Sequence, residues 1–197
     1  CVTSLTHVKG RSEMTDAPLL EVKDLKVEIS TKAGSFFPVN GHNFTVNAGE
    51  TLGIVGESGS GKSMTAMSLV RLLPKHAAHI RSGSIKLNGR DLLTLSDKEM
   101  RRVRGSEIAM ILQDPQTSLN PAFTVGDQIS EALSLHTTGP RRTLRDRAID
   151  ALRKVKVAAP EHRVDAYPSE LSGGMRQRVV GAIAISCQPK IIIADEP

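Results

Sequence analysis

Apolar residues recur along this chain with two spacings, and each spacing predicts a different secondary structure. Residues 20–29 alternate apolar and polar positions, which is typical of a strand with one buried face. Short continuous apolar runs, which indicate strands buried on both faces, occur at residues 51–55, 108–112 and 191–194. Shorter strand patterns occur at residues 44–46 and at 84–87, where Asn88-Gly89 predicts a turn.

Helical spacing separates these strands. It covers residues 62–73, which end at Pro74, residues 124–157 and residues 172–185. Ser96 and Glu99 are spaced as a capping box for a helix that runs to Arg104. Thr143 with Asp146 predicts the start of another helix. Buried strands separated by helices indicate an α/β fold whose sheet is at least partly parallel.

Composition narrows the classes of function. Aromatic residues make up only 3% of the chain, so nucleic-acid binding through stacked rings is not expected. The net charge of +5 suits an acidic ligand without requiring nucleic acid. No apolar run reaches the roughly 18 residues of a membrane span, and the first residues lack the pattern of a signal peptide. We therefore expect a soluble, intracellular chain that meets a membrane only peripherally.

The most specific motif lies between the strand at 51–55 and the helix that begins at residue 62. Its sequence from Gly56 to Ser63, Gly-Glu-Ser-Gly-Ser-Gly-Lys-Ser, matches a phosphate-binding loop in the required strand–loop–helix context. Glycines let backbone N–H groups turn toward phosphate oxygens, and the helix N-terminus adds the positive end of its dipole. Lys62 is expected to reach the β- and γ-phosphates, and the Ser63 hydroxyl is expected to hold Mg²⁺.

Two carboxylates, Asp195 and Glu196, directly follow the apolar strand at 191–194. This position is the carboxyl end of a strand, where ligands bind in open α/β sheets. Beside a phosphate loop, Asp195 is expected to help hold Mg²⁺, and Glu196 is expected to polarise the attacking water.

A second anion-binding pattern opens the helix expected at 172–185. It consists of Ser172, Gly173 and Gly174, which leave backbone N–H groups open to an anion. A single nucleotide does not explain two phosphate-type sites in one chain. Two facing chains would explain them, each supplying its Ser-Gly-Gly to the γ-phosphate bound by the other.

Three motifs together resemble those of ABC-type ATPases. They are the phosphate loop, the Leu-Ser-Gly-Gly-x-x-Gln-Arg string at 171–178 and the Ile-Ile-Ile-Ala-Asp-Glu-Pro strand, in the family's order. Gln113, in Ile-Leu-Gln-Asp-Pro-Gln-Thr-Ser-Leu-Asn-Pro, is similar to the family's glutamine loop. More narrowly, the chain looks like the ATP-binding subunits of oligopeptide, dipeptide and nickel importers over about residues 18–197.

This resemblance implies a P-loop NTPase fold of the ABC ATPase type, an α/β fold with a RecA-like core and an antiparallel β subdomain. It also implies an inserted helical subdomain at about 114–170, with ATP and Mg²⁺ as ligands. The residues that it places at the nucleotide are Gly56, Glu57, Ser58, Gly59, Ser60, Gly61, Lys62, Ser63 and Met64, with Phe36 or Phe37 stacked on adenine.

The resemblance also implies a role for each residue of the reaction centre. Contacts to Mg²⁺ are implied for Ser63, Gln113 and Asp195. Catalytic roles are implied for Glu196, Gln113 and Lys62. Ser172, Gly173 and Gly174 would contact the ATP of a partner subunit.

The two ends of the chain set its expected extent. We expect residues 1–17 to be a disordered extension, with Met14 as the natural start, and residues 18–197 to form the ABC ATPase domain. The family's next strands, one of which ends in a switch histidine, do not follow Pro197. We therefore expect a fragment that is impaired in ATP turnover, from a parent protein that hydrolyses ATP.

The implied function is the ATPase subunit of an importer for peptides or nickel, dimerising head to tail on permease subunits. Its implied partners are a second ABC ATPase subunit, identical or paralogous, integral membrane permeases and, indirectly, a substrate-binding protein. They meet at the cytoplasmic face of the inner membrane, and nucleic acid is not among them. Two alternatives stay open: a nucleotide-binding fragment that does not hydrolyse ATP, and a soluble ABC ATPase not tied to transport.

Overall fold

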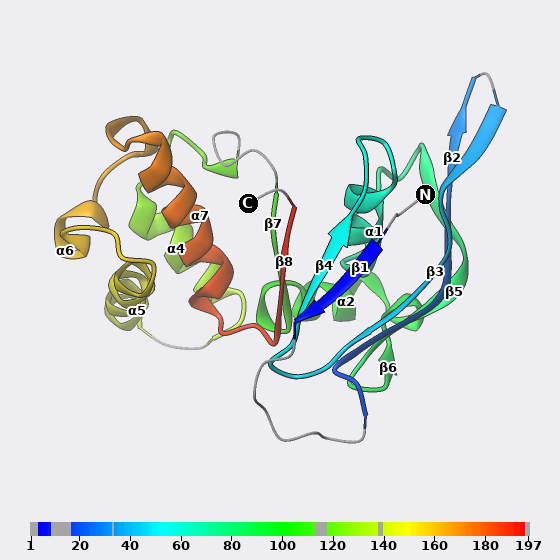
Figure 1. Cartoon of the computed structure of the whole chain (residues 1–197). Helices are drawn as coiled ribbons and strands as arrows, with labels where there is room; N and C mark the ends of the chain where they lie inside the picture. Colours follow the sequence, from blue (N-terminus) through cyan, green and yellow to red (C-terminus); the bar gives the residue numbers. More distant parts are fainter. Residues whose placement is uncertain (1–3, 9–16, 33, 113–117, 138–139, 196–197) are drawn as a thin grey trace. The chain divides into compact units, whose positions relative to one another are not determined.

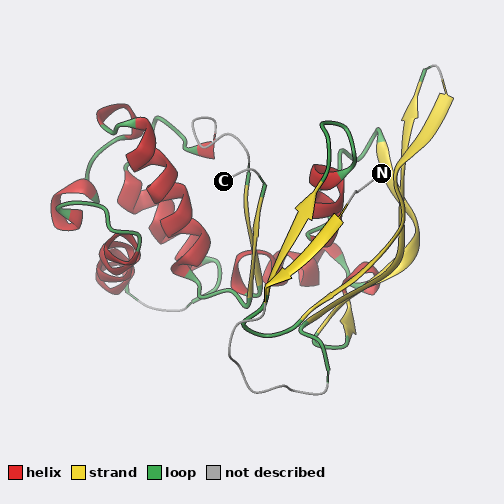
Figure 2. Cartoon of the chain, viewed as in Figure 1, coloured by secondary structure: helices red, strands yellow, loops and turns green. Residues whose placement is uncertain are grey.

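The computed structural model describes residues 4–8, 17–32, 34–112, 118–137 and 140–195. The chain divides into two compact units, Cys1–Met100 and Arg101–Pro197. Strands dominate the first unit, and helices dominate the second (Figure 2).

The first unit contains a four-stranded antiparallel sheet in the order β3-β2-β5-β6 (Figure 1). Its strands are β2 (Leu20–Thr31), β3 (Gly34–Val46), β5 (Ala78–Leu87) and β6 (Arg90–Asp91). Leu20, Val22, Leu25 and Val27 of β2 are buried, which confirms the strand predicted at 20–29. Strands β3 and β5 are longer than predicted, because antiparallel pairing to β2 extends them beyond their apolar stretches.

Strand β4 (Thr51–Val55) leads through the Gly-rich loop into helix α1 (Lys62–Leu69). The predicted end of this helix at residue 73 is wrong. The chain leaves the helical conformation after Leu69 because Arg71 adopts a left-handed conformation, with φ 51°, and its N–H bonds to Ser68 O.

A short strand, β1 (Ser4–Val8), lies within residues 1–17, where we expected disorder. It pairs antiparallel to β4, with Ser4 opposite Val55 and Val8 opposite Thr51. The strand that precedes the phosphate loop, β4, is therefore paired with an antiparallel strand, β1.

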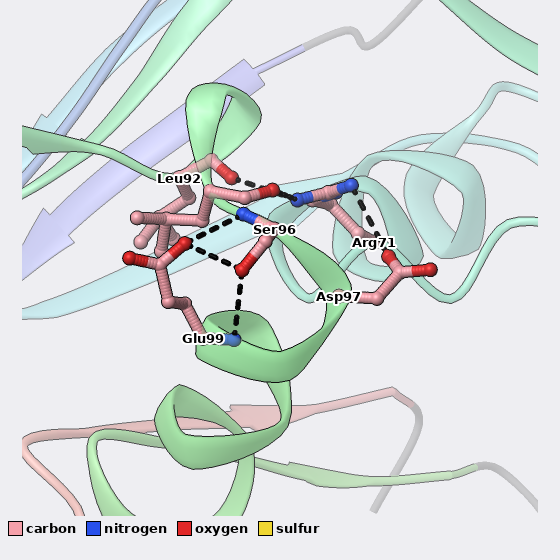
Figure 3. A network of polar contacts seen from close by, with 6 residues as sticks. Arg71, Leu92, Ser96, Asp97 and Glu99 are labelled. Atoms are coloured by element: carbon pink, nitrogen blue, oxygen red, sulfur yellow. Dashed lines mark hydrogen bonds and ion pairs between the residues drawn. The ribbon is translucent and has the colours of Figure 1, made fainter.

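The end of α1 is tied to the start of α2 (Asp97–Ser106) by a side chain. The Arg71 guanidinium donates to the carbonyl oxygens of Leu92, at 3.3 Å, and Leu95, at 2.5 Å, in and after η1 (Leu92–Thr94) (Figure 3). The predicted capping box is confirmed. Glu99 Oε2 accepts hydrogen bonds from Ser96 N at 2.8 Å and from Ser96 Oγ at 2.6 Å.

In the second unit, strand β7 (Ile108–Ile111) pairs with β8 (Ile191–Ala194) in parallel, with Ile108 opposite Ile191 (Figure 1). This confirms that the sheet is partly parallel. It also places the carboxyl ends of both strands at the same edge.

Among the described residues from 118 onward, the second unit contains the helices α4 (Val125–Ser134), α5 (Arg141–Lys154), α6 (Pro160–Arg163), η2 (Pro168–Glu170) and α7 (Gly173–Ser186). Helices α4, α5 and α7 share one aliphatic core, in which Ile129, Leu152 and Val179 are almost completely buried. The predicted helix start at Thr143 is wrong. Helix α5 begins at Arg141, directly after Pro140, whose φ of −66° suits the approach to a first helical turn.

Candidate nucleotide-binding site

The phosphate loop joins β4 to α1 through two glycines in left-handed conformations. Gly59 has φ 79° and Gly61 has φ 94°. A Cβ on Gly61 would overlap the carbonyl oxygen of Pro38 and lie 3.5 Å from Val39 Cγ2. Glycine is therefore required at position 61 for two reasons: the left-handed backbone conformation and the close approach of the loop to β3.

The side chain of Lys62 folds back over this loop. Its Nζ donates hydrogen bonds to the carbonyl oxygens of Gly56, at 2.8 Å, and Glu57, at 3.0 Å. These bonds hold the ammonium group at the loop itself. An ammonium group has three N–H donors, so the one that these two bonds do not use is available to a phosphate oxygen.

One polar atom of the loop is buried without a partner. Ser60 Oγ makes no hydrogen bond within the described residues, although the residue is only 9% exposed. Leaving such a group unpaired costs about 1–3 kcal/mol. A hydroxyl that is unpaired here fits a loop built around a polar ligand. The neighbouring residues 57–59 are exposed, and Ser63 and Met64 are half-buried.

Phe36 and Phe37, the two candidates for stacking on adenine, lie on β3 shortly before Pro38. Their exposed fractions are 52% and 47%. Large aromatic side chains are usually more buried than this. Both rings are open to a ligand.

Asp195 directly follows β8 and continues its ladder, because its N–H donates to Ile111 O at 3.0 Å. The residue is 9% exposed, which is unusual for a carboxylate. The other two residues predicted for this centre, Gln113 and Glu196, lie outside the described residues. The phosphate loop belongs to the first unit and Asp195 to the second.

Ser172 is the N-cap of α7, and its Oγ accepts a hydrogen bond from Met175 N at 3.4 Å. Gly173 and Gly174 are exposed, and a Cβ on either would meet no described atom within 4 Å. The turn predicted to bind an anion, residues 172–174, therefore forms the N-terminus of helix α7. Its surface is open to a second molecule.

The segment that precedes Ser172 is held by α4 and α5. Val125 N donates to Ala166 O at 2.9 Å. Arg145 forms a two-pronged ion pair with Asp165, with N–O distances of 2.6 Å and 2.7 Å. The hydrogen bonds from this guanidinium lower the pKa of the Asp165 carboxyl.

Sequence reasoning missed two residues beside the phosphate loop, His42 and Thr65. His42 Nδ1 lies 3.1 Å from Thr65 Oγ1. The predicted strand began only at residue 44, so nothing in the sequence directed His42 toward α1. The longer strand β3 brings the two residues together.

Comparison with known proteins gives a consistent result. Residues 39–197 match the family described as ABC transporter. The chain is 50% identical, over 179 residues, to the oligopeptide transport ATP-binding protein OppD of Bacillus subtilis, which covers 91% of this chain and 50% of that protein. It is 47% identical, over 179 residues, to the dipeptide transport ATP-binding protein DppD of Escherichia coli. That match covers 91% of this chain and 54% of DppD. The chain thus spans about half the length of the curated relatives it matches.

Solved structures agree on the fold. A dimeric, post-hydrolysis ATP-binding cassette, MJ0796 with ADP and Pi, superposes with a TM-score of 0.76 at 24% identity, over 89% of this chain and 73% of that one. The structure of cbiO1 from Clostridium perfringens, part of the ABC transporter complex cbiONQ, superposes with a TM-score of 0.70 at 25% identity. The match covers 91% of this chain and 66% of that one. This confirms the P-loop fold with its antiparallel β subdomain. Because the sequence match runs from β3 through both units, the chain belongs to the ABC transporter family.

Proposed function

We propose that this chain is the ATP-binding and ATP-hydrolysing part of a subunit that powers an ABC importer for peptides. The observation that carries the proposal is the strand–loop–helix from Thr51 to Leu69, with Lys62 Nζ held over the loop carbonyls. Peptides are the proposed cargo because two close relatives are named as oligopeptide and dipeptide transport proteins. Nickel is the second cargo to be tested.

The residues of the first unit would hold the triphosphate. Backbone N–H groups of residues 56–63 and the Lys62 ammonium group supply the positive potential, and Phe36 or Phe37 supplies a stacking surface for adenine. The Ser63 hydroxyl, with Gln113 and Asp195, would hold Mg²⁺. This ion, when bound, offsets phosphate charge and makes the phosphorus more electrophilic.

The residues of the second unit would complete the reaction. Glu196 follows Asp195 and would orient the attacking water and take up its proton. Ser172, Gly173 and Gly174 would present the open N-terminus of α7 to the γ-phosphate on a second ABC subunit. The dimeric state of the MJ0796 cassette supports such a pairing.

The proposed setting is the cytoplasmic face of the inner membrane, on integral permease subunits, with a substrate-binding protein as an indirect partner. In the part of the chain that the structure describes, no helix combines the length and the apolar character needed to cross a bilayer.

The first test is ATP binding by this chain, measured by calorimetry with and without Mg²⁺. We expect Lys62→Ala to weaken binding at least ten-fold, because the ammonium group contributes a charge-assisted contact. Lys190→Ala, which removes an exposed lysine near Glu107, is the matched control and should bind as the wild type does. Equal binding by the Lys62 and Lys190 variants would reject the site.

The second test concerns ATP hydrolysis, measured as phosphate release. The wild type should release phosphate from ATP, whereas Glu196→Gln should bind ATP without releasing it. Binding without turnover in the wild type would instead support the alternative of a non-hydrolysing subunit.

A further inference from the structure

A chain of hydrogen bonds runs from β3 to the start of α1. His42 Nδ1 lies 3.1 Å from Thr65 Oγ1, and Thr65 Oγ1 donates to Gly61 O at 2.9 Å. The same carbonyl oxygen accepts the Thr65 backbone N–H at 2.8 Å. Gly61 is the residue whose left-handed conformation turns the phosphate loop into the helix.

The direction of these bonds follows from the donors available. A threonine hydroxyl carries a single proton, and the Thr65 proton points to Gly61 O. With the Thr65 proton on Gly61 O, the His42 tautomer that carries its proton on Nδ1 donates to Thr65 Oγ1 across the 3.1 Å contact. Burial lowers the pKa of His42, which favours the neutral ring. Thr65 is completely buried, where an unpaired hydroxyl would be costly.

The orientation of the Gly61 carbonyl decides where the next N–H points. A trans peptide is planar, so the C=O of Gly61 and the N–H of Lys62 point in opposite directions. With the carbonyl held inside α1 by two bonds from Thr65, the Lys62 N–H is directed out of the helix N-terminus, toward the phosphate loop. Aligned hydrogen bonds also polarise one another, which strengthens the set.

We propose that His42 is a positioning residue for the phosphate loop, acting through Thr65 Oγ1 on the Gly61–Lys62 peptide and so raising the affinity for phosphate groups. This inference rests on the proposed function, because it assigns His42 to the same nucleotide site. The contact joins β3, which carries Phe36 and Phe37, to the loop that would bind phosphates.

The test compares variants of this chain for binding of MgATP and of pyrophosphate, which has no adenine. Thr65→Val keeps the shape of the side chain and removes the hydroxyl, and His42→Ala removes the donor. Each should weaken binding of both ligands about three- to ten-fold, the range expected for one buried hydrogen bond. His42→Asn places an amide N–H donor near the Nδ1 position and should restore most of the affinity. His79→Ala, an exposed histidine of β5, is the matched control and should bind as the wild type does.

Two further results decide the matter. His42→Ala combined with Thr65→Val should bind no more weakly than Thr65→Val alone, because both changes break one chain of bonds. A histidine that only stabilises β3 would lower the thermal midpoint without this coupling and without rescue by asparagine. The inference is overturned if His42→Ala binds both ligands within two-fold of wild type, or if the two changes add independently. If the wild type and Lys62→Ala bind ATP equally, the proposed function itself fails.

Discussion

Gly126 in the first turn of α4 rests on the backbone of Val164: its N–H donates to the Val164 carbonyl oxygen at 2.7 Å. A Cβ on Gly126 would stand 2.5 Å from Val164 Cγ2 and 2.7 Å from that oxygen. Together with the bond from Val125 N to Ala166 O, this contact ties the start of α4 to the segment that leads into Ser172.

We therefore expect Gly126→Ala to destabilise the protein by about 1–3 kcal/mol, the usual cost of overpacking against atoms that cannot move aside. Denaturant unfolding would measure it. Gly181→Ala in α7 is the matched control, because its Cβ would meet Val155 Cγ1 at an ordinary 3.8 Å. That variant should be neutral or more stable by up to about 1 kcal/mol, since alanine favours helix over glycine. Equal losses in the two variants would contradict the tight contact.

Arg71 supports a second prediction, in the first unit. Its guanidinium donates to the carbonyl oxygens of Leu92 and Leu95, and Leu92 is fully buried (Figure 3). Arg71→Ala should lower the free energy of unfolding by about 1–3 kcal/mol, because the carbonyl groups of Leu92 and Leu95 lose a charged donor. Asp97→Asn should change it by less than about 0.5 kcal/mol, since this carboxylate is 76% exposed and 3.5 Å from Arg71 Nη2. Thermal unfolding of both variants checks the contrast.

The predictions that the sequence supported best were those with a local cause. The strand at β2, the capping box of Ser96 and Glu99 and the phosphate loop each depend on residues close together in the sequence. The helix ends at residue 73 and at Thr143 were misplaced. Arg71 ends α1 in a conformation that arginine adopts rarely, and α5 begins at Arg141 because Pro140, with φ −66°, precedes its first turn.

The motifs of the candidate site could be predicted from the sequence, but the contacts that hold the phosphate loop in place could not. The contact between His42 and Thr65 depends on the length of β3, which pairing with β2 determines. The contact between Gly61 and Pro38 likewise joins residues from separate elements. Such contacts leave no periodic pattern in a sequence, because their cause is tertiary packing.

The two left-handed glycines of the phosphate loop should respond differently to alanine. At Gly61 a Cβ would overlap Pro38 O, so Gly61→Ala should both lower stability by about 2 kcal/mol or more and abolish ATP binding. At Gly59 a Cβ meets no described atom within 4 Å, so Gly59→Ala bears only the strain of φ 79°, about 1–2 kcal/mol. Calorimetry with ATP and thermal unfolding would separate the two. A Gly61 variant that binds ATP as well as the Gly59 variant would refute the close approach of β3.

The ion pair of Arg145 and Asp165 predicts a pH dependence. Hydrogen bonds from Arg145 hold the pKa of Asp165 below its ordinary value of 3.8, and the pair raises the pKa of Arg145. As the pH falls, the unfolded chain therefore takes up a proton at Asp165 before the folded chain does. The pair's contribution to stability is complete above about pH 4 and is lost as the pH falls through the lowered pKa.

Carboxyl resonances followed by NMR through an acid titration would measure this pKa directly. In the wild type the Asp165 midpoint should lie below 3.8, and in Arg145→Gln it should rise toward that value, because glutamine supplies no charge. Asp165→Asn should reduce stability at neutral pH by about 1 kcal/mol or less, since both side chains are exposed. Asp146→Asn, which removes an exposed carboxylate next to Arg145 in the sequence, is the control and should leave the Asp165 midpoint nearly unchanged. An Asp165 midpoint that is the same with and without Arg145 would show that the pair does not persist in solution.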